Sequence, residues 1–346
     1  MKKFYAKYLF FKKLVFARLT HKAIPVYLYW SLTENCNLQC SYCYGLFGKQ
    51  SYQNLSACEA IRLIDEFDRI GVKRITILGG EPLLYNEIDA VVDALCKRNI
   101  SCSILTNATL AVEHIDILKK VDEVGLSLDG SPPVHDRIRG EGNFDDIIRT
   151  IKALKSIGKK IVVTYTLFSE NIQELEFVLE FVKKQNVLLT VNIAHSRIDS
   201  IKNIPVSKAD NESLRSALAK VITYKKMGYP ILRTYKTLYQ MLAWQDFYID
   251  GTKEKPCADF PVCMFGKFAA CVAPDGVMYP CFLGTDKSTG KNILEVGIEE
   301  AWGNCQKIDH CYYCHVPCFI EYNALLNLKV YMIMSIISKL VLKCKR

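Results

Sequence analysis

The central part of the chain alternates short apolar runs with longer amphipathic stretches. The runs have the length of β-strands, and the stretches between them carry apolar residues at helical spacing. The predicted strands are 26–32, 74–78, 101–106, 123–128, 161–168 and 187–193, and the predicted helices between them are 55–70, 86–98, 110–120, 144–157 and 171–185. Because a crossover between parallel strands needs a connecting helix, these repeats predict a parallel sheet. The sheet is either an open doubly wound one or a curved partial barrel, and in both cases ligands bind where the strands end.

The pattern changes at both ends of this region. Two more helices are predicted at 209–228 and 235–247, and after Gly251 the chain turns to short segments rich in cysteine. Before the first strand, apolar residues recur at helical spacing, and they are Phe4, Tyr8, Phe11, Val15 and Leu19. We therefore expect four segments: a basic amphipathic helix at 1–25, an α/β domain at 26–250, a small α+β extension at 251–322, and a basic apolar helix at 323–346.

Positive charge is concentrated at the two ends. The net charge is +9, yet residues 1–33 contain seven basic residues and residues 322–346 contain five, with no acidic residue in either stretch. The part between them therefore carries a net charge of −3, which argues against a nucleic-acid partner. Lysines interrupt both ends short of the ~20 apolar residues that a membrane span needs. Such ends are typical of helices on an anionic membrane surface, and packing on the protein body or on a second subunit is the alternative.

Cysteine is the most informative residue type in the chain. There are 15 cysteines in 346 residues, and the first 30 residues show no secretory signal, so metal ligands in a reducing cytosol are expected rather than disulfides. Cys36, Cys40 and Cys43 directly follow the first predicted strand. A zinc site or an iron–sulfur cluster normally takes four ligands. With three cysteines, one iron of a cluster would stay open for a further ligand. A zinc site completed by a fourth residue that is distant in the sequence is the alternative.

Further motifs follow the next three predicted strands. Gly79-Gly-Glu-Pro82 ends the second, Leu105-Thr-Asn-Ala-Thr109 the third, and Ser127-Leu-Asp-Gly130 the fourth, followed by His135-Asp-Arg-Ile-Arg-Gly140. Together with Cys-x3-Cys-x2-Cys and the aromatic Tyr42, these motifs resemble those of the radical S-adenosylmethionine (SAM) superfamily. The last run resembles its peptide-modifying branch. The resemblance covers about residues 26–195 well and extends more loosely to about 320.

The resemblance implies a partial (β/α)6 TIM-like barrel with a [4Fe–4S] cluster on the three cysteines. SAM would chelate the open iron, and its reductive cleavage would give a 5′-deoxyadenosyl radical that abstracts a substrate hydrogen. The implied SAM contacts are Tyr42, Gly79, Gly80, Glu81, Pro82, Thr106, Asn107, Ser127, Asp129 and Thr166. The glycines would let backbone approach a ligand, and Glu81 would accept a hydrogen bond from the SAM ammonium. Asp129 and His195 are the candidate proton acceptors, although Thr166 and His195 also fit ordinary strand and loop positions.

The second group of cysteines lies between residues 257 and 318. A hairpin is predicted at Pro274-Asp-Gly276, and Cys263-x12-Gly276-x4-Cys281 around it resembles the SPASM or twitch extension, which binds auxiliary [4Fe–4S] clusters. The final cysteines depart from that pattern, because the gap of five residues between two cysteines comes before the gap of two residues and not after it. We expect at least one auxiliary cluster, with zinc as the alternative. Its expected ligands are Cys263, Cys281, Cys314 and Cys318, with Cys257 or Cys311 as substitutes.

Substrate class is less determined by the sequence. The resemblance favours a peptide or protein as substrate, whereas the amphipathic ends favour a lipid-linked or other membrane-associated substrate. The first strand is preceded by about 25 residues, which leave no room for a leader-peptide domain. We expect a cytoplasmic protein, peripheral at the inner face of the membrane, that receives electrons from a flavodoxin or ferredoxin. The alternative is a non-catalytic iron–sulfur electron carrier or metal-stabilised binding protein, which explains the cysteines but not the motifs at the strand ends.

Overall fold

The parallel sheet predicted from the sequence is present and lies at the centre of the protein. The structure, a computed structural model, describes residues 2–43, 54–194, 210–247, 251–252, 260–281, 287–307 and 312–335. Six strands pair in chain order, each parallel to the next: β1 (Tyr27–Ser31), β2 (Arg74–Leu78), β3 (Ser101–Thr106), β4 (Glu123–Ser127), β5 (Ile161–Leu167) and β6 (Leu188–Ile193). Their ends agree with the predicted ends to within one residue.

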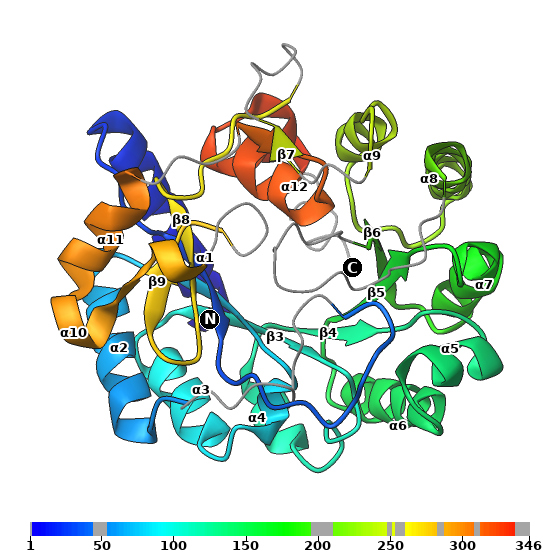
Figure 1. Cartoon of the computed structure of the whole chain (residues 1–346), viewed down its shortest axis with the longest axis horizontal. Coiled ribbons are helices and arrows are strands. Elements are labelled where there is room, and N and C mark those ends of the chain that lie inside the picture. Colours follow the sequence, from blue (N-terminus) through cyan, green and yellow to red (C-terminus); the bar gives the residue numbers. More distant parts are fainter. Residues whose placement is uncertain are drawn as a thin grey trace.

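Helices cover the outer face of this sheet (Figure 1). They are α2 (Ala57–Ile70), α3 (Ile88–Lys97), α4 (Ile115–Lys120), α6 (Asn143–Ser156), α7 (Leu175–Lys184) and α8 (Asn211–Lys226), followed by α9 (Tyr235–Leu242). The start of α2 is fixed by a capping box between Ser56 and Glu59. Helix α5 (Pro132–Arg139) was not predicted, and prolines in its first turn are compatible with a helix because that turn needs no backbone N–H.

The cysteine-rich extension continues the central sheet. Strand β8 (Ala269–Val272) pairs in parallel with β1, β9 (Val277–Tyr279) pairs antiparallel with β8, and β10 (Lys291–Asn292) pairs with β9. The hairpin predicted at Pro274–Gly276 is therefore present, and Gly276 takes the positive φ of 85° that the turn requires. Within the described part of the chain, the sheet has nine strands and stays open between β10 and β6, as expected of a partial barrel. A small second sheet joins β7 (Gly251–Thr252) to β11 (Tyr313–Cys314).

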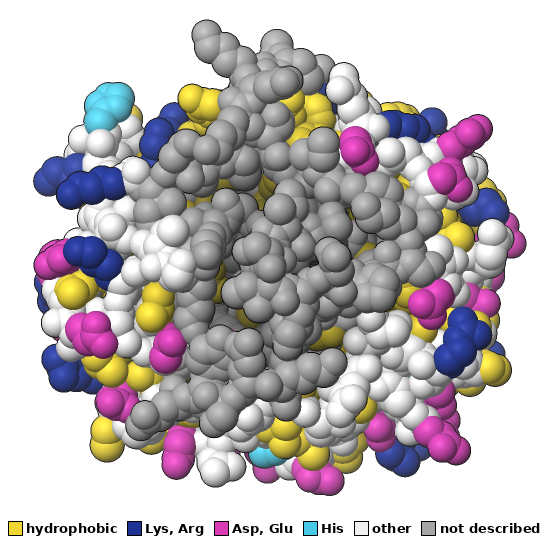
Figure 2. Space-filling view, viewed as in Figure 1, with side chains coloured by type: hydrophobic (Ala, Val, Ile, Leu, Met, Phe, Trp, Pro, Cys, Tyr) yellow, Lys and Arg dark blue, Asp and Glu magenta, His cyan; other side chains and the backbone are white. Residues whose placement is uncertain are grey.

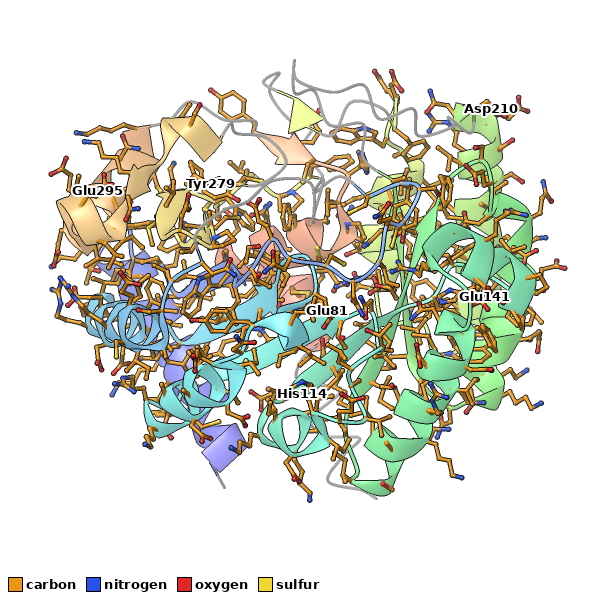
Figure 3. The ribbon with its side chains drawn as sticks, turned by 60° about the horizontal axis from the view of Figure 1, so that its bottom comes forward. Glu81, His114, Glu141, Asp210, Tyr279 and Glu295 are labelled. Atoms are coloured by element: carbon orange, nitrogen blue, oxygen red, sulfur yellow. The ribbon has the colours of Figure 1, made fainter. Side chains whose placement is uncertain are left out.

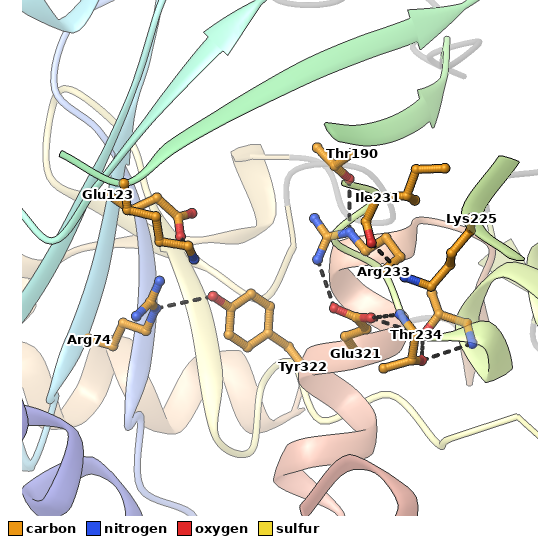
Figure 4. Close-up of polar contacts among 11 residues, drawn as sticks. Arg74, Glu123, Thr190, Lys225, Ile231, Arg233, Thr234, Glu321 and Tyr322 are labelled. Atoms are coloured by element: carbon orange, nitrogen blue, oxygen red, sulfur yellow. Dashed lines mark hydrogen bonds and ion pairs between the residues drawn. The ribbon is translucent and has the colours of Figure 1, made fainter. Parts of the chain in front are cut away.

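Helix α12 (Pro317–Leu326) lies between the two edges of the open sheet (Figure 1). Arg74 at the start of β2 donates a hydrogen bond to the Tyr322 hydroxyl over 3.1 Å. Arg233 forms an ion pair with Glu321 over 2.9 Å and also donates to Thr190 of β6 (Figure 4). These buried contacts fix α12 to both β2 and β6, so the C-terminal part of the chain closes the gap in the barrel.

Helix α1 (Lys2–Leu19) packs with α12 and with the inner faces of β1 and β8 in a second hydrophobic cluster. Its buried side chains are Phe10, Leu14 and Ala17. The apolar face expected from the sequence lies on the other side of the helix and is largely exposed. The difference arises because both apolar and basic residues are spread around α1, so periodicity alone did not show which face would be buried. Among the described residues, no helix has both the length and the hydropathy of a membrane span.

Candidate functional site

The three cysteines of the first motif lie on the loop that follows β1, at the edge where the parallel strands end. All three are partly buried. Groups from two other strand ends reach this loop. The side-chain amide nitrogen of Asn107 lies 4.0 Å from Cys36 Sγ, and Arg139 Nη1 lies 3.8 Å from Cys40 Sγ. The loop is thus positioned by residues that follow β3 and β4.

The electrostatics of Cys40 show that the thiols share one neighbourhood. Burial, opposed by the nearby Arg139 and reinforced by Cys43, Asp129 and Cys36, raises the pKa of the Cys40 thiol to about 11. Among the described residues, no three His, Cys, Asp or Glu side chains converge as ligands of a single metal ion do. In a cuboidal cluster each cysteine binds a different iron, so the sulfurs stand farther apart than in a mononuclear site. Three neighbouring thiols on one loop are the donor set that such a cluster takes.

Two glycines after β2 lie directly against the backbone that leads into this loop. A Cβ on Gly79 would lie 2.3 Å from the Thr33 carbonyl oxygen, and a Cβ on Gly80 would lie 2.2 Å from that of Asn35. Gly80 N donates to Thr33 O, and Glu81 N donates to Asn35 O, both over 2.8 Å. The sequence predicted a close approach between these glycines and a ligand. The structure shows a close approach to the chain's own backbone, which positions the cysteine loop.

The Glu81 carboxylate joins the ends of β2 and β3 in the interior of the molecule (Figure 3). It accepts hydrogen bonds from Thr106 Oγ1 and Asn107 N, both over 2.7 Å, and from Leu83 N over 3.1 Å. Burial raises its pKa to about 7, and these three hydrogen bonds counteract the shift. Pro82 begins the short 3-10 turn that carries Leu83. A carboxylate has about four acceptor positions, so one remains for a further donor.

A buried ion pair lies at the end of β4. Arg139 Nε donates to Asp129 Oδ2 over 2.5 Å, and the two side chains are 8% and 0% exposed. The Tyr42 hydroxyl also donates to Asp129 Oδ2, over 2.9 Å, and accepts a hydrogen bond from Arg139. The second Asp129 oxygen, Oδ1, is buried with no hydrogen-bond partner among the described residues. A buried acceptor left open in this way indicates a place for a donor from a bound ligand.

His135 forms a hydrogen bond with the backbone of Asp129 and so holds this residue in place. Its Nδ1 accepts a hydrogen bond from the Asp129 backbone N–H over 3.1 Å, and its Nε2 lies 3.0 Å from Asn143 Oδ1. Asn143 in turn donates to the Asn107 carbonyl over 3.0 Å. Burial, followed by the nearby Arg139, lowers the pKa of His135 to about 4, so the ring is neutral at pH 7. This chain of contacts ties the ends of β3 and β4 together.

The remaining predicted strand residues face the inside of the curved sheet. Ser127 on β4 and Thr166 on β5 are partly exposed, whereas their neighbours Leu126, Tyr165 and Leu167 are buried in the outer core. Because side chains alternate along a strand, Ser127 and Thr166 point into the barrel. The candidate proton acceptor His195 lies outside the described residues.

Comparison with known proteins finds a family model that matches the part of the chain that carries these strand ends. The radical SAM superfamily matches residues 30–182, which span β1 to α7 and include the three cysteines and all the strand ends described above. The match covers less than half of the chain, and over these residues the chain is similar to the radical SAM superfamily.

The chain is similar to two curated proteins and, in its fold, to a crystal structure. The mycofactocin maturase MftC of Mycolicibacterium smegmatis is 31% identical over 159 residues, 44% of this chain and 40% of MftC. The subtilosin biosynthesis protein AlbA of Bacillus subtilis is 25% identical over 86% of this chain and 64% of AlbA. The fold is similar to that of Streptococcus suis SuiB bound to its precursor peptide SuiA, with a TM-score of 0.64, 19% identity, and coverage of 86% of this chain and 70% of SuiB. The chain thus spans less than two thirds of the length of the curated relatives that it matches.

Sequence reasoning missed Arg139 as a site residue. Arg139 belongs to the His135–Gly140 run, which contributes to the family resemblance but does not by itself indicate a site residue. A basic residue five positions before the predicted helix at 144–157 carries no local signal of burial. Only the packing of α5 against the cysteine loop shows that its guanidinium lies between Asp129 and Cys40.

The extension gathers its cysteines in the second hydrophobic cluster. Three distant segments contribute thiols to it, and the predicted ligands among them are Cys263, Cys281, Cys314 and Cys318. Cys271 packs in the same cluster, whereas Cys305 is buried in the outer core. Cys318 interacts with the Tyr29 hydroxyl of β1 and the Arg233 guanidinium, both of which lower its pKa against the larger effect of burial. Cys257 and Cys311 lie outside the described residues.

Proposed function

We propose that this protein is a radical SAM enzyme, which holds a [4Fe–4S] cluster on Cys36, Cys40 and Cys43 and uses SAM to abstract a hydrogen atom from its substrate. The observation that carries the proposal is the arrangement at the strand ends. Three neighbouring thiols lie on one loop, and the buried Asp129 beside them keeps an acceptor oxygen open. An iron–sulfur electron carrier requires only the thiols, so that function does not explain the open acceptor oxygen of Asp129.

When bound, the reduced cluster and SAM supply a carbon-centred radical, and the protein supplies position and exclusion of water. Arg139 lies beside Cys40 and carries the positive charge that would orient the carboxylate of SAM. Glu81 has one acceptor position left for the ammonium group. Asp129 Oδ1 is open to a hydroxyl donor such as the ribose, and Ser127 and Thr166 offer hydroxyls from the inner face of the sheet.

We further propose one auxiliary [4Fe–4S] cluster in the extension, on Cys263, Cys281, Cys314 and Cys318. Their place in one hydrophobic cluster supports the donor set, since thiols from separate segments of the chain pack in the same region. Structural cysteines in a hydrophobic core are the alternative. An auxiliary cluster predicts about eight irons per chain after reconstitution, against about four for the first loop alone.

A peptide or protein is the proposed substrate. Both MftC and AlbA are named for roles in peptide-derived products, and SuiB has been crystallised with a precursor peptide. The proposal includes a flavodoxin or ferredoxin as the electron donor, and a cytoplasmic enzyme held at the inner face of the membrane by its basic ends. Acidic and basic side chains alternate around the rim of the face shown in Figure 2, so its described part has no broad basic groove for nucleic acid.

SAM cleavage tests the proposed activity. After anaerobic reconstitution and reduction, wild-type protein should convert SAM to 5′-deoxyadenosine, and addition of a substrate peptide should raise the yield. Cys40→Ala should abolish the product. Cys58→Ala is the matched control, because Cys58 is an exposed cysteine on α2 and should retain full turnover. A wild-type protein that carries its iron but releases no 5′-deoxyadenosine would favour the electron carrier instead.

A further inference from the structure

Helix α1 exposes an apolar stripe although it is firmly packed on the protein. Phe10, Leu14 and Ala17 bury one face against the second hydrophobic cluster. On the opposite face Val15 is 42% exposed, and the stripe continues with Tyr8, Phe16 and Leu19, the last of which is 76% exposed. Positions 8, 15 and 19 share one side of a helix because they are seven and four residues apart. The stripe is therefore fixed in place and directed outwards.

The charges that α1 and the residues after it carry are all positive. Lys12 lies within it and Lys22 lies beyond its end, and both are exposed. Residues 1–33 contain no acidic side chain. A lysine within an apolar stripe can extend its ammonium group to the lipid headgroups while its stem stays on the apolar surface. A second copy of the same helix would bring like charges together, so charge complementarity favours an anionic lipid surface over self-association.

The stripe lies on the side of the barrel where the strands begin. The chain passes from α1 through residues 24–26 directly into the start of β1. Lys13 packs against Gly71, which ends α2 just before β2, since its Cε would lie 2.5 Å from a Cβ built there. The cysteine loop follows the other end of β1. The length of the sheet therefore separates α1 from the candidate site.

We propose that α1 docks on an anionic membrane surface through the stripe of Tyr8, Val15, Phe16 and Leu19, and that the site at the strand ends then opens away from the membrane. The docking deepens the proposed function by naming the face of α1 that binds lipid, and the orientation rests on the site proposed there, whereas neither requires that SAM be cleaved. Substrate would reach such a site from the aqueous side. This arrangement favours a water-soluble peptide over a lipid as the molecule that loses the hydrogen.

Vesicle binding by the full chain tests the docking. Vesicles of phosphatidylcholine with phosphatidylglycerol should bind the wild type, and vesicles of phosphatidylcholine alone should bind it much less. Val15→Glu should lower the partition coefficient by about tenfold or more. Val112→Glu should change it less than about twofold, because Val112 is a similarly exposed valine (45%) that follows the end of β3 on the side of the site. Thermal unfolding checks that both variants are folded.

Fluorescence quenching tests the orientation. The three native tryptophans are buried, so an added exposed tryptophan gives a distinct signal. With brominated lipids, Phe16→Trp should be quenched and Val112→Trp should not. Equal quenching at both positions would overturn the orientation. Binding that is equally strong for Val15→Glu, or a Val15-dependent dimer without vesicle binding, would overturn the docking. These measurements need no SAM, so they fail independently of the proposed enzyme activity.

Discussion

Replacement of Gly80 by alanine should displace the cysteine loop while the fold is kept. The added Cβ would lie 2.2 Å from Asn35 O, 2.6 Å from Asn35 C and 2.8 Å from Glu34 O. An ordinary carbon–oxygen contact is about 3.3 Å, so the backbone before Cys36 would have to withdraw by about 1 Å. Gly80 does not have a positive φ, so the effect is steric and not conformational.

The displacement acts on two hydrogen bonds. Gly80 N–Thr33 O and Glu81 N–Asn35 O, each 2.8 Å long, would be stretched beyond the usual range. Each such bond contributes about 0.5–1.5 kcal/mol, and overpacking of a close contact costs about 1–3 kcal/mol. The free energy of unfolding should therefore fall by about 2–6 kcal/mol, unless the loop itself gives way. In either case the three thiols lose their relative positions.

Iron content and unfolding measured together check this prediction. Reconstituted Gly80→Ala should lose about four irons per chain and with them the formation of 5′-deoxyadenosine. Gly303→Ala is the control, because no atom lies within 4 Å of its added Cβ and its place in α11 (Ile298–Lys307) should make it slightly stabilising. A Gly80→Ala protein with wild-type iron, stability and turnover would refute the reasoning that backbone contact positions the loop.

Three further predictions concern buried groups. Arg139→Gln should lower the free energy of unfolding by about 3–5 kcal/mol, since Asp129 would stay buried without its partner, whereas the exposed Arg137→Gln should have little effect in the same denaturant titration. Burial holds the pKa of His135 at about 4, below its ordinary 6.5, so the unfolded chain binds more protons between these values. The contribution of His135 to the free energy of unfolding should be complete above pH 6.5 and fall by about 3 kcal/mol toward pH 4. His135→Gln should flatten this dependence on pH, and an unchanged dependence in the variant would contradict the assignment. Cys314→Ala should remove about half of the reconstituted iron, whereas Cys305→Ala in the outer core should remove none, and equal iron in both would argue against the auxiliary cluster.

Much of the fold was predictable because it is set by local pattern. Apolar runs of strand length and helical periodicity placed β1 to β6 and most of their helices. Helix α5 was missed because its eight residues are short and begin with two prolines, which resemble a loop in sequence. The parallel pairing of β8 with β1 was also missed, because local periodicity carries no information about which strand lies at which edge.

The sequence by itself determined where the candidate groups lie, because three thiols within eight residues share a loop and strand ends in a parallel sheet share an edge. Tertiary structure alone decided what surrounds them. Arg139 reaches Cys40 across 99 positions, and Gly80 meets the backbone of Asn35. It also decided which face of α1 is buried. Such contacts depend on how rigid elements pack at a distance, and a pattern of neighbouring residues does not encode that packing.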